Sequence, residues 1–239
     1  MSQISQALIL AAGEGKRMLP LTKKIPKPLA KVDGTALIDH IINKLSHLPN
    51  LQKIVVNSHY LAPILENHLK NLQNNKIIIS PEQEKLETGG GLVNAMKFFN
   101  KNEPILIING DLFWQEAGGN FLQKMIASFG EQKMDILLAL KKKEDFFGYD
   151  GAGDFDLDKN CNVIKRPKNN PYAYIGAQII HPKILSKAPQ EQYFSLNHFF
   201  KIAQDKNGFL QGIKGFEANC QAFHIGTVKT LSQVNQIID

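Results

Sequence analysis

Hydrophobic residues in the first half of the chain alternate between short unbroken runs and runs with helical spacing. Four short apolar runs, bounded by polar residues or glycine, have the pattern of buried strands: 6–12, 53–58, 76–80 and 104–110. Three segments between them carry apolar residues three and four positions apart, as on one face of a helix: 36–48, 61–72 and 91–99. This β-α-β-α-β-α-β order predicts an α/β fold with a doubly wound, mostly parallel sheet.

The second half has a different hydrophobic pattern, with more strand-like runs and fewer helices between them. The strand-like segments are 134–140, 151–158, 161–167, 172–181 and 209–216. The segments with helical spacing are 119–129, 195–205 and 227–238. We therefore expect mixed strands to extend the sheet and cover the open end of the first half. No disordered linker or internal repeat interrupts the sequence, so we predict one domain over residues 1–239.

Composition places the chain among globular proteins, with 43% hydrophobic and 21% charged residues. No apolar run approaches the roughly 20 residues that a membrane span needs. The first ten residues lack the features of a secretory signal peptide. Two cysteines, Cys161 and Cys220, make no disulfide framework. We expect a cytoplasmic protein with no membrane partner.

Positive charge is concentrated beside a glycine-containing loop. The formal net charge is +6, and six basic residues lie close to that loop: Lys16, Arg17, Lys23, Lys24, Lys27 and Lys31. The other dense basic run is Lys141–Lys143. A basic chain raises the possibility of nucleic-acid binding. Because the excess is local, it favours a small polyanion, and we expect no nucleic-acid partner.

The glycine loop itself fits neither of two common phosphate-binding patterns. After Gly13 and Gly15, Met18 takes the position of the third glycine of a dinucleotide fingerprint, and no P-loop motif is present. The two glycines still allow a tight turn whose N–H groups meet phosphate oxygens. Arg17 adds a planar cation, and Lys27 is held between two prolines. The alternative is a strand-to-helix turn with surface lysines.

Two further features stand at predicted strand ends, where open α/β sheets bind ligands. Asp111 follows the strand 104–110 and offers an oxygen ligand for Mg²⁺, or alternatively caps a turn. The segment 87–91 places three glycines before a helix, which suits a ligand lying against the helix N-terminus; a flexible loop is the alternative.

Taken together, these segments resemble the sugar-1-phosphate nucleotidyltransferases. LAAGEGKRMLPLTKKIPKPL (10–29) is similar to their signature L-A-A-G-x-G-x-R-M-x-P-L-T-x-x-x-P-K-P-L. SPEQEKLETGGG, INGDLFW, GDFDL and IIHPKIL resemble the N-acetylmuramate-1-phosphate uridylyltransferases of cell-wall recycling. The similarity runs from Ala7 to the C-terminus and weakens between Glu116 and Gly148. It implies a Rossmann-like nucleotidyltransferase fold, with a nucleotide-binding half (1–115) and a sugar-phosphate-binding half (116–239).

The resemblance also implies a reaction: a nucleoside triphosphate and a sugar 1-phosphate give an NDP-sugar and pyrophosphate. It assigns catalysis to Arg17 and Lys27. It assigns nucleotide binding to Ala11, Ala12, Gly13, Gly15, Glu82, Thr88 and Gly89. It assigns sugar-phosphate binding to Gly90, Asn109, Gly153, Arg166 and Gly176. UTP and N-acetylmuramate 1-phosphate are the favoured substrates, and a monomer or homodimer is expected.

The metal site departs from the family pattern. Asp111 is the implied ligand for Mg²⁺, but His224 occupies the place of the second metal-binding aspartate. Imidazole is a poorer ligand for Mg²⁺ than for Mn²⁺ or Co²⁺, so Mn²⁺ is an alternative metal. Other functions stay open: a mannose-1-phosphate guanylyltransferase, a glucose-1-phosphate thymidylyltransferase, or a regulatory protein that binds nucleotide or sugar without turnover.

Overall fold

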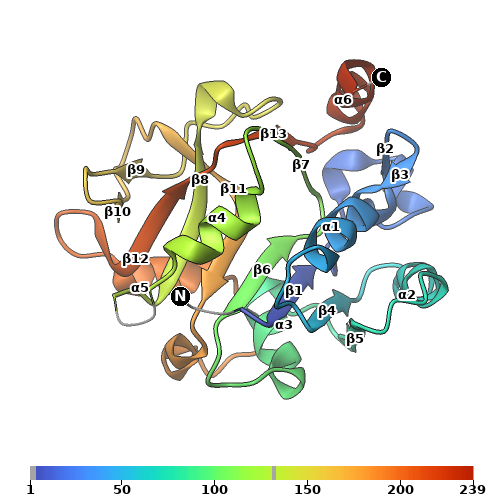
Figure 1. Cartoon of the computed structure of the whole chain (residues 1–239), viewed down its shortest axis with the longest axis horizontal. Coiled ribbons are helices and arrows are strands. Elements are labelled where there is room, and N and C mark those ends of the chain that lie inside the picture. The colour runs from blue at the N-terminus through green and yellow to red at the C-terminus, as the bar shows by residue number, and fades with distance from the viewer. Residues whose placement is uncertain (1–3, 131–132, 239) are drawn as a thin grey trace.

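A nine-stranded sheet forms the centre of the computed structural model, which describes residues 4–130 and 133–238. The strand order is β5-β4-β1-β6-β11-β8-β12-β10-β9 (Figure 1). The first four strands in this order are parallel: β1 (Gln6–Leu10), β4 (Lys53–Ser58), β5 (Ile77–Pro81) and β6 (Ile105–Asn109). They correspond to the four apolar runs, so the predicted parallel core is confirmed.

Strands from the second half continue the sheet beyond β6. These are β11 (Tyr172–Ile180), β8 (Ile136–Lys142), β12 (Phe209–Glu217), β10 (Asn162–Ile164) and β9 (Asp156–Leu157). β11 runs antiparallel to both β6 and β8, while β12 is parallel to β8. The sheet is therefore mixed, as the sequence predicts.

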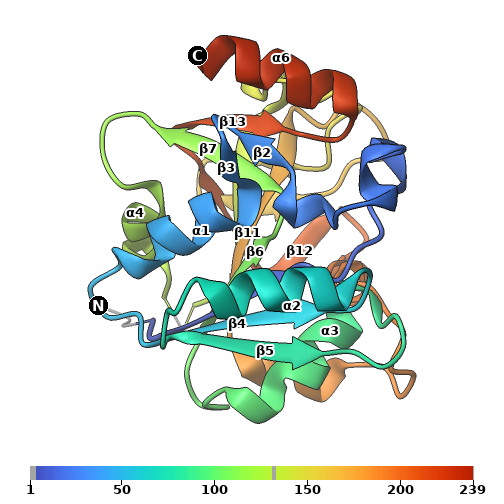
Figure 2. The ribbon, with the colours of Figure 1, turned by 90° about the vertical axis from the view of Figure 1, so that its right-hand side faces the viewer.

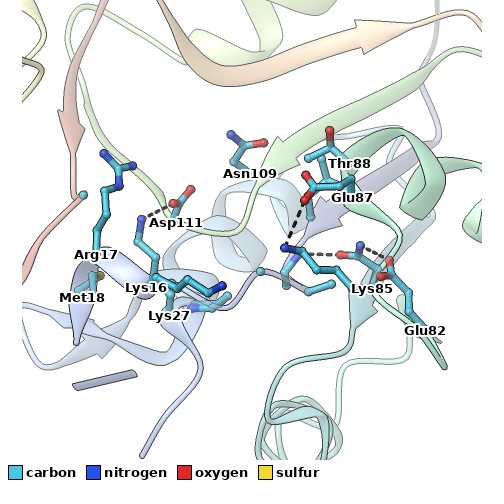
Figure 3. Close-up of a pocket in the computed structure, with 18 residues that line it drawn as sticks. Lys16, Arg17, Met18, Lys27, Glu82, Lys85, Glu87, Thr88, Asn109 and Asp111 are labelled. Atoms are coloured by element: carbon cyan, nitrogen blue, oxygen red, sulfur yellow. Dashed lines mark hydrogen bonds and ion pairs between the residues drawn. The ribbon is translucent and has the colours of Figure 1, made fainter. Parts of the chain in front are cut away.

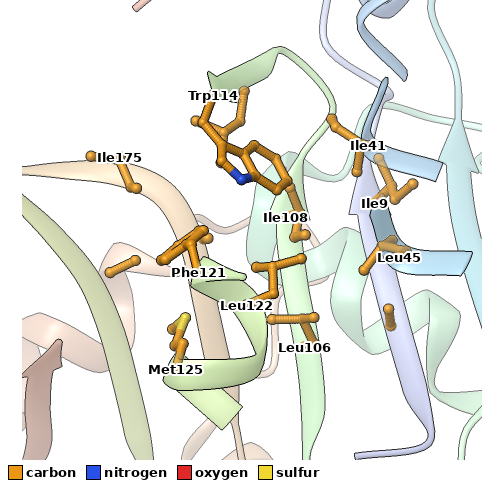
Figure 4. Close-up of a cluster of buried hydrophobic side chains, with 14 of the residues drawn as sticks. Ile9, Ile41, Leu45, Leu106, Ile108, Trp114, Phe121, Leu122, Met125 and Ile175 are labelled. Atoms are coloured by element: carbon orange, nitrogen blue, oxygen red, sulfur yellow. The ribbon is translucent and has the colours of Figure 1, made fainter. Parts of the chain in front are cut away.

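Helices cover both faces of this sheet. One face packs against α1 (Leu37–Ser46), α2 (Ala62–Asn71) and α4 (Phe121–Ser128). The other packs against α3 (Glu87–Ala95) and α5 (Asn197–Ala203). Figure 4 shows the first face, where Ile9 and Ile108 of the strands meet Ile41 and Leu45 of α1. Alternate strand residues point to opposite faces, so unbroken apolar strands need a helical layer on each side.

Six short 3₁₀ helices complete the main framework within residues 4–130 and 133–238. They are η1 (Lys16–Met18), η2 (Leu21–Lys23), η3 (Lys27–Leu29), η4 (Met96–Phe98), η5 (Lys143–Asp145) and η6 (Pro182–Lys187). Three of them carry the basic segment that follows β1. No helix in the described ranges has the length and apolar character to cross a membrane.

A smaller layer, which the sequence pattern did not predict apart from its helix, packs beside the main sheet. β7 (Leu112–Glu116) pairs antiparallel with β13 (Cys220–His224), and β2 (Lys31–Val32) pairs with β3 (Thr35–Ala36). The predicted C-terminal helix α6 (Val228–Ile238) lies over these strands (Figure 2). The layer positions the site because β7 begins directly after Asp111.

Candidate active site

A cavity of about 400 Å³ opens where the parallel strands end, as the rule for open α/β sheets predicts. Figure 3 shows its two walls, one around Arg17, Lys27 and Asp111 and the other around Glu82, Lys85 and Thr88. The sequence-predicted residues that line it are Ala11, Ala12, Gly13, Gly15, Arg17, Lys27, Glu82, Thr88, Asn109 and Asp111. Residues far apart in the chain thus meet in this first cavity.

Gly15 allows the glycine loop to pack closely against the segment that carries Lys27. Its backbone has φ +62°, and an added Cβ would lie 2.9 Å from Thr22 Cγ2 and 3.0 Å from Lys27 Cβ. The Thr22 hydroxyl donates to the Gly15 carbonyl at 3.0 Å. Glycine is needed here both for the left-handed conformation and for the close approach. Gly13, in contrast, has nothing within 4 Å of an added Cβ and lies open at the cavity.

Lys27 is presented by a short, rigid turn. It begins η3 between Pro26 and Pro28, and only 9% of the residue is exposed. Its ammonium forms an ion pair with the Asp111 carboxylate. Asp111 stands just beyond β6, where Gly110 N–H donates to the Leu10 carbonyl at 2.8 Å. The Lys27 ammonium, predicted to bind phosphate, and the Asp111 carboxylate, predicted to bind the metal, are therefore direct neighbours.

Arg17 differs from the other cations of the first cavity. Lys16 pairs with Glu14 at 2.9 Å, and Lys85 pairs with Glu87 at 3.3 Å. Within the described ranges Arg17 forms no ion pair, and its side chain is exposed at the cavity. An unpaired guanidinium beside open backbone is suited to phosphate oxygens.

On the opposite wall, Asn57 joins the glycine loop to Glu82. Its Oδ1 accepts from Ala11 N–H at 2.6 Å, and its Nδ2 donates to Glu82 Oε1 at 2.6 Å. Gly91 leaves room for this pair, since an added Cβ would lie 2.7 Å from Glu82 Oε1. Burial raises the pKa of the Glu82 carboxyl, although the hydrogen bond from Asn57 opposes the shift.

The glycines of segment 87–91 serve protein packing at positions 89 and 90. Both lie inside α3, and their N–H groups donate to the Phe194 carbonyl at 2.8 and 3.1 Å. An added Cβ on Gly90 would lie 1.9 Å from the Gln192 carbonyl oxygen. Segment 190–196 thus occupies the space beside the helix N-terminus where a ligand was predicted. Gly89 and Gly90 do not line the first cavity, whereas Thr88 does.

The remaining predicted sugar-phosphate residues lie farther along the sheet. Gly176 (φ +97°) brings β11 against Asn109, with an added Cβ 3.0 Å from its Nδ2. Gly153 and Arg166 line a second cavity of about 710 Å³, formed by residues of the second half. Arg166 is held by Asp156, to which its Nε donates at 2.7 Å.

His224 lies behind the first cavity and is absent from its lining. Burial, and then the positive charges of Arg17 and Lys27, lower the pKa of its imidazole. The ring packs edge-on against Phe146 and Tyr149. The described residues contain no group of three or more His, Cys, Asp or Glu side chains placed to hold a metal. A divalent cation fits here only if Asp111 shares it with a ligand's oxygens and water.

Asn57, Lys85 and Glu87 are among the residues that line the first cavity but were not predicted as site residues. Asn57 had a detectable signal, because it is a polar residue near the carboxyl end of a strand. Glu87 begins the segment 87–91 that was placed at a strand end, but neither its role nor that of Lys85 was predicted, because both depend on the path of the loop after β5. Lys85 reaches Glu14 of the glycine loop at 3.5 Å and thereby links the two walls.

Comparison with known proteins places this geometry in a family. The nucleotidyl transferase family model matches residues 6–194. N-acetylmuramate alpha-1-phosphate uridylyltransferase of Caulobacter vibrioides is 33% identical over 206 residues, covering 83% of this chain and 84% of that protein. D-glycero-alpha-D-manno-heptose 1-phosphate guanylyltransferase of Campylobacter jejuni is 32% identical, covering 82% of this chain and 85% of that protein.

Solved structures support the same fold. HddC from Yersinia pseudotuberculosis, complexed with GMP-PN, has a TM-score of 0.73 at 20% identity, covering 99% of this chain and 100% of that one. UDP-glucose pyrophosphorylase from Acinetobacter baumannii has a TM-score of 0.77 at 15% identity, covering 97% of this chain and 92% of that one. The chain therefore belongs to the nucleotidyl transferase family, among its sugar-1-phosphate nucleotidyltransferases.

Proposed function

We propose that this enzyme transfers a uridylyl group from UTP to N-acetylmuramate 1-phosphate, releasing pyrophosphate and forming a UDP-sugar. The observation that carries the proposal is the meeting of Arg17, Lys27 and Asp111 around an open glycine loop, opposite a buried carboxylate at Glu82. The choice of sugar rests on the similarity to the Caulobacter uridylyltransferase.

The proposed chemistry is an in-line displacement at the α-phosphorus of the nucleotide. An oxygen of the sugar phosphate forms the new P–O bond while the bond to pyrophosphate breaks, so no covalent enzyme intermediate is needed. Arg17 neutralises the departing pyrophosphate, and Lys27 binds the reacting phosphate. Catalysis then consists of positioning and charge neutralisation by preorganised cations.

Asp111 is the residue proposed to hold a divalent cation together with the triphosphate. Such a cation would neutralise phosphate charge and orient the oxygens. In the structure, the Lys27 ammonium pairs with that carboxylate. Binding of nucleotide gives Lys27 a phosphate partner and leaves Asp111 available to the cation.

Base selection is proposed to depend on Glu82. An ionised carboxylate only accepts hydrogen bonds, which suits the N3–H of uracil or thymine and the N1–H of guanine. It opposes the bare N1 of adenine and N3 of cytosine. Because guanine also satisfies Glu82, a guanylyltransferase is the second candidate, supported by the similarity to the Campylobacter enzyme.

The division into two halves is part of the proposal. Apart from Gly226, every residue lining the first cavity lies between positions 10 and 111. Every residue lining the second cavity lies between positions 143 and 200. We assign the nucleotide to residues 1–115 and the sugar phosphate mainly to residues 116–239.

The test is a pyrophosphate-release assay that combines UTP, dTTP, GTP, ATP or CTP with a panel of sugar 1-phosphates. The expected result is the highest kcat/KM with UTP and N-acetylmuramate 1-phosphate. A clear preference for GTP with a neutral sugar would establish the second candidate instead. Absence of turnover with every pair, by protein whose folding is verified, would support a regulatory nucleotide-binding role.

A further inference from the structure

The second cavity, in the half assigned above to the sugar phosphate, is lined by lysines to which the proposed reaction gives no role. Its charged lining residues are the cations Lys143, Lys165, Arg166 and Lys168 and a single carboxylate, Asp154. Its volume of about 710 Å³ lies within the roughly 300–1,000 Å³ range of small-molecule sites. The cavity is thus large enough for a ligand and is predominantly positive.

The one carboxylate of the cavity and its arginine are already engaged. Asp154 Oδ2 accepts from Tyr174 N–H at 2.9 Å and faces the Tyr149 hydroxyl at 3.5 Å. Arg166 donates to Asp156, with Nη2 and Nε each 2.7 Å from Oδ2. These contacts join strands to loops. They leave the lysine ammonium groups as the positive charges that are available to a ligand.

The three lysines have no carboxylate partner among the residues that the structure describes. Lys165 lies over the Phe155 ring, with Nζ 5.9 Å from its centroid, and Lys143 and Lys168 form no ion pair. In the first cavity, by contrast, every lysine is paired with a carboxylate. Unpaired cations gathered in one cavity leave a positive potential there.

The backbone that carries two of these charges is held in place rather than loosely attached. Asn170 is buried, and its side chain exchanges two hydrogen bonds of 3.0 Å with the backbone N–H and carbonyl of Arg166. Gly153 admits this loop, because an added Cβ would lie 1.8 Å from the Asn170 carbonyl oxygen. Lys168 therefore stands on a short loop that is closed at both ends.

Tyr174 connects the second cavity to the first. Its ring lines the second cavity, while its hydroxyl is covered and has no hydrogen-bond partner in the described structure. Burial, together with the nearby Asp111 carboxylate, raises the pKa of this hydroxyl. Tyr174 thus borders the second cavity and lies within the electrostatic influence of Asp111 in the first.

We propose that the second cavity binds a carboxylate carried by the sugar acceptor, and that Lys165 and Lys168 are the residues that select it. The proposal rests on the transfer to N-acetylmuramate 1-phosphate proposed above and adds the residues that recognise the second, non-phosphate negative charge of that acceptor. A neutral sugar leaves both ammonium groups hydrated, whereas an acidic one gains charge-assisted hydrogen bonds. Since both lysines are exposed, each contributes a modest factor, about twofold to fivefold.

The kinetic test compares N-acetylmuramate 1-phosphate with N-acetylglucosamine 1-phosphate, which lacks the lactyl carboxylate. The variants are K165Q, K168Q and the double variant; K159Q is the matched control, because Lys159 is exposed but outside the cavity. The double variant is expected to raise KM for the acidic sugar at least about fourfold while leaving KM for the neutral sugar and kcat within twofold. An unchanged acidic-to-neutral ratio of kcat/KM would overturn the proposal.

A second measurement separates this proposal from the proposed reaction. Calorimetric titration with N-acetylmuramic acid, which has the carboxylate but no phosphate, needs neither nucleotide nor turnover. Wild type and K159Q are expected to bind it more tightly than N-acetylglucosamine, and the double variant to lose the difference. If the carboxylate preference is present without UTP turnover, only the proposed reaction fails; if UTP turnover is present without the preference, only the carboxylate site fails.

Discussion

In the proposed reaction, binding of the phosphate groups depends most on Lys27 and Arg17. Replacing either by alanine should lower kcat by at least about 100-fold, the scale for losing a preorganised charge contact in the transition state. Pyrophosphate release measures this directly. Lys23→Ala is the control, since Lys23 is exposed in the same segment but outside the cavity lining. A near-normal rate in a folded Arg17→Ala or Lys27→Ala protein would remove that residue from the mechanism.

Glu82 should determine both base selection and an acidic pH limit. Glu82→Gln replaces a charged acceptor and should lower kcat/KM for UTP about 10- to 100-fold, the range for a hydrogen bond to a charged group. Burial raises the pKa of Glu82, so its carboxylate is lost at a higher pH than that of an exposed glutamate. KM for UTP should therefore rise as pH falls through that pKa.

The Glu82→Gln protein should lack this additional acidic limb, because its amide does not titrate. UTP itself titrates identically in both assays, so its effect cancels in the ratio of the two pH profiles. Glu84→Gln controls for surface charge, because Glu84 is an exposed neighbour of Glu82. The same raised pKa makes folding less favourable as pH rises through it, and the substitution should abolish that loss in urea unfolding. Parallel pH profiles for wild type and Glu82→Gln would contradict the assignment.

His224 tests the metal assignment at Asp111. If the imidazole contributes to the cation, His224→Asp should lower the Mg²⁺ concentration for half-maximal rate and reduce the advantage of Mn²⁺, since carboxylate suits Mg²⁺ better. The measurement is rate against metal concentration for both ions. If neither quantity changes, His224 only packs edge-on against Phe146 and Tyr149, which stack on each other.

At the scale of elements, the contact between α3 and segment 190–196 joins the two halves of the chain. Gly90→Ala places a Cβ against a backbone carbonyl and should destabilise the fold by about 1–3 kcal/mol, the usual cost of overpacking. Gly13→Ala should have a much smaller effect on stability, because an added Cβ there meets nothing within 4 Å. Urea unfolding of both variants tests this, and equal stability of Gly90→Ala and wild type would contradict it.

For the molecule as a whole, the features that can be predicted from the sequence are those that depend on residues close together in the chain. The parallel core strands and most helices carry their own periodicity, and the glycine loop carries its own motif. The pairing of β7 with β13 was missed because Glu116 and Cys220 meet only after the chain returns from the far end of the sheet. The packing role of Gly90 was missed for the same reason, since its partner Gln192 lies about a hundred residues downstream.

The most direct measurement of the donor and the reaction is a competition in one vessel. The enzyme is given equal concentrations of UTP, GTP, ATP and CTP with N-acetylmuramate 1-phosphate, and the nucleotide sugars are quantified by mass spectrometry alongside pyrophosphate. The expected result is a UDP-sugar as the dominant product, formed in a one-to-one ratio with pyrophosphate. A dominant GDP-, ADP- or CDP-sugar, or nucleotide consumption with no nucleotide sugar formed, would contradict the proposed uridylyl transfer.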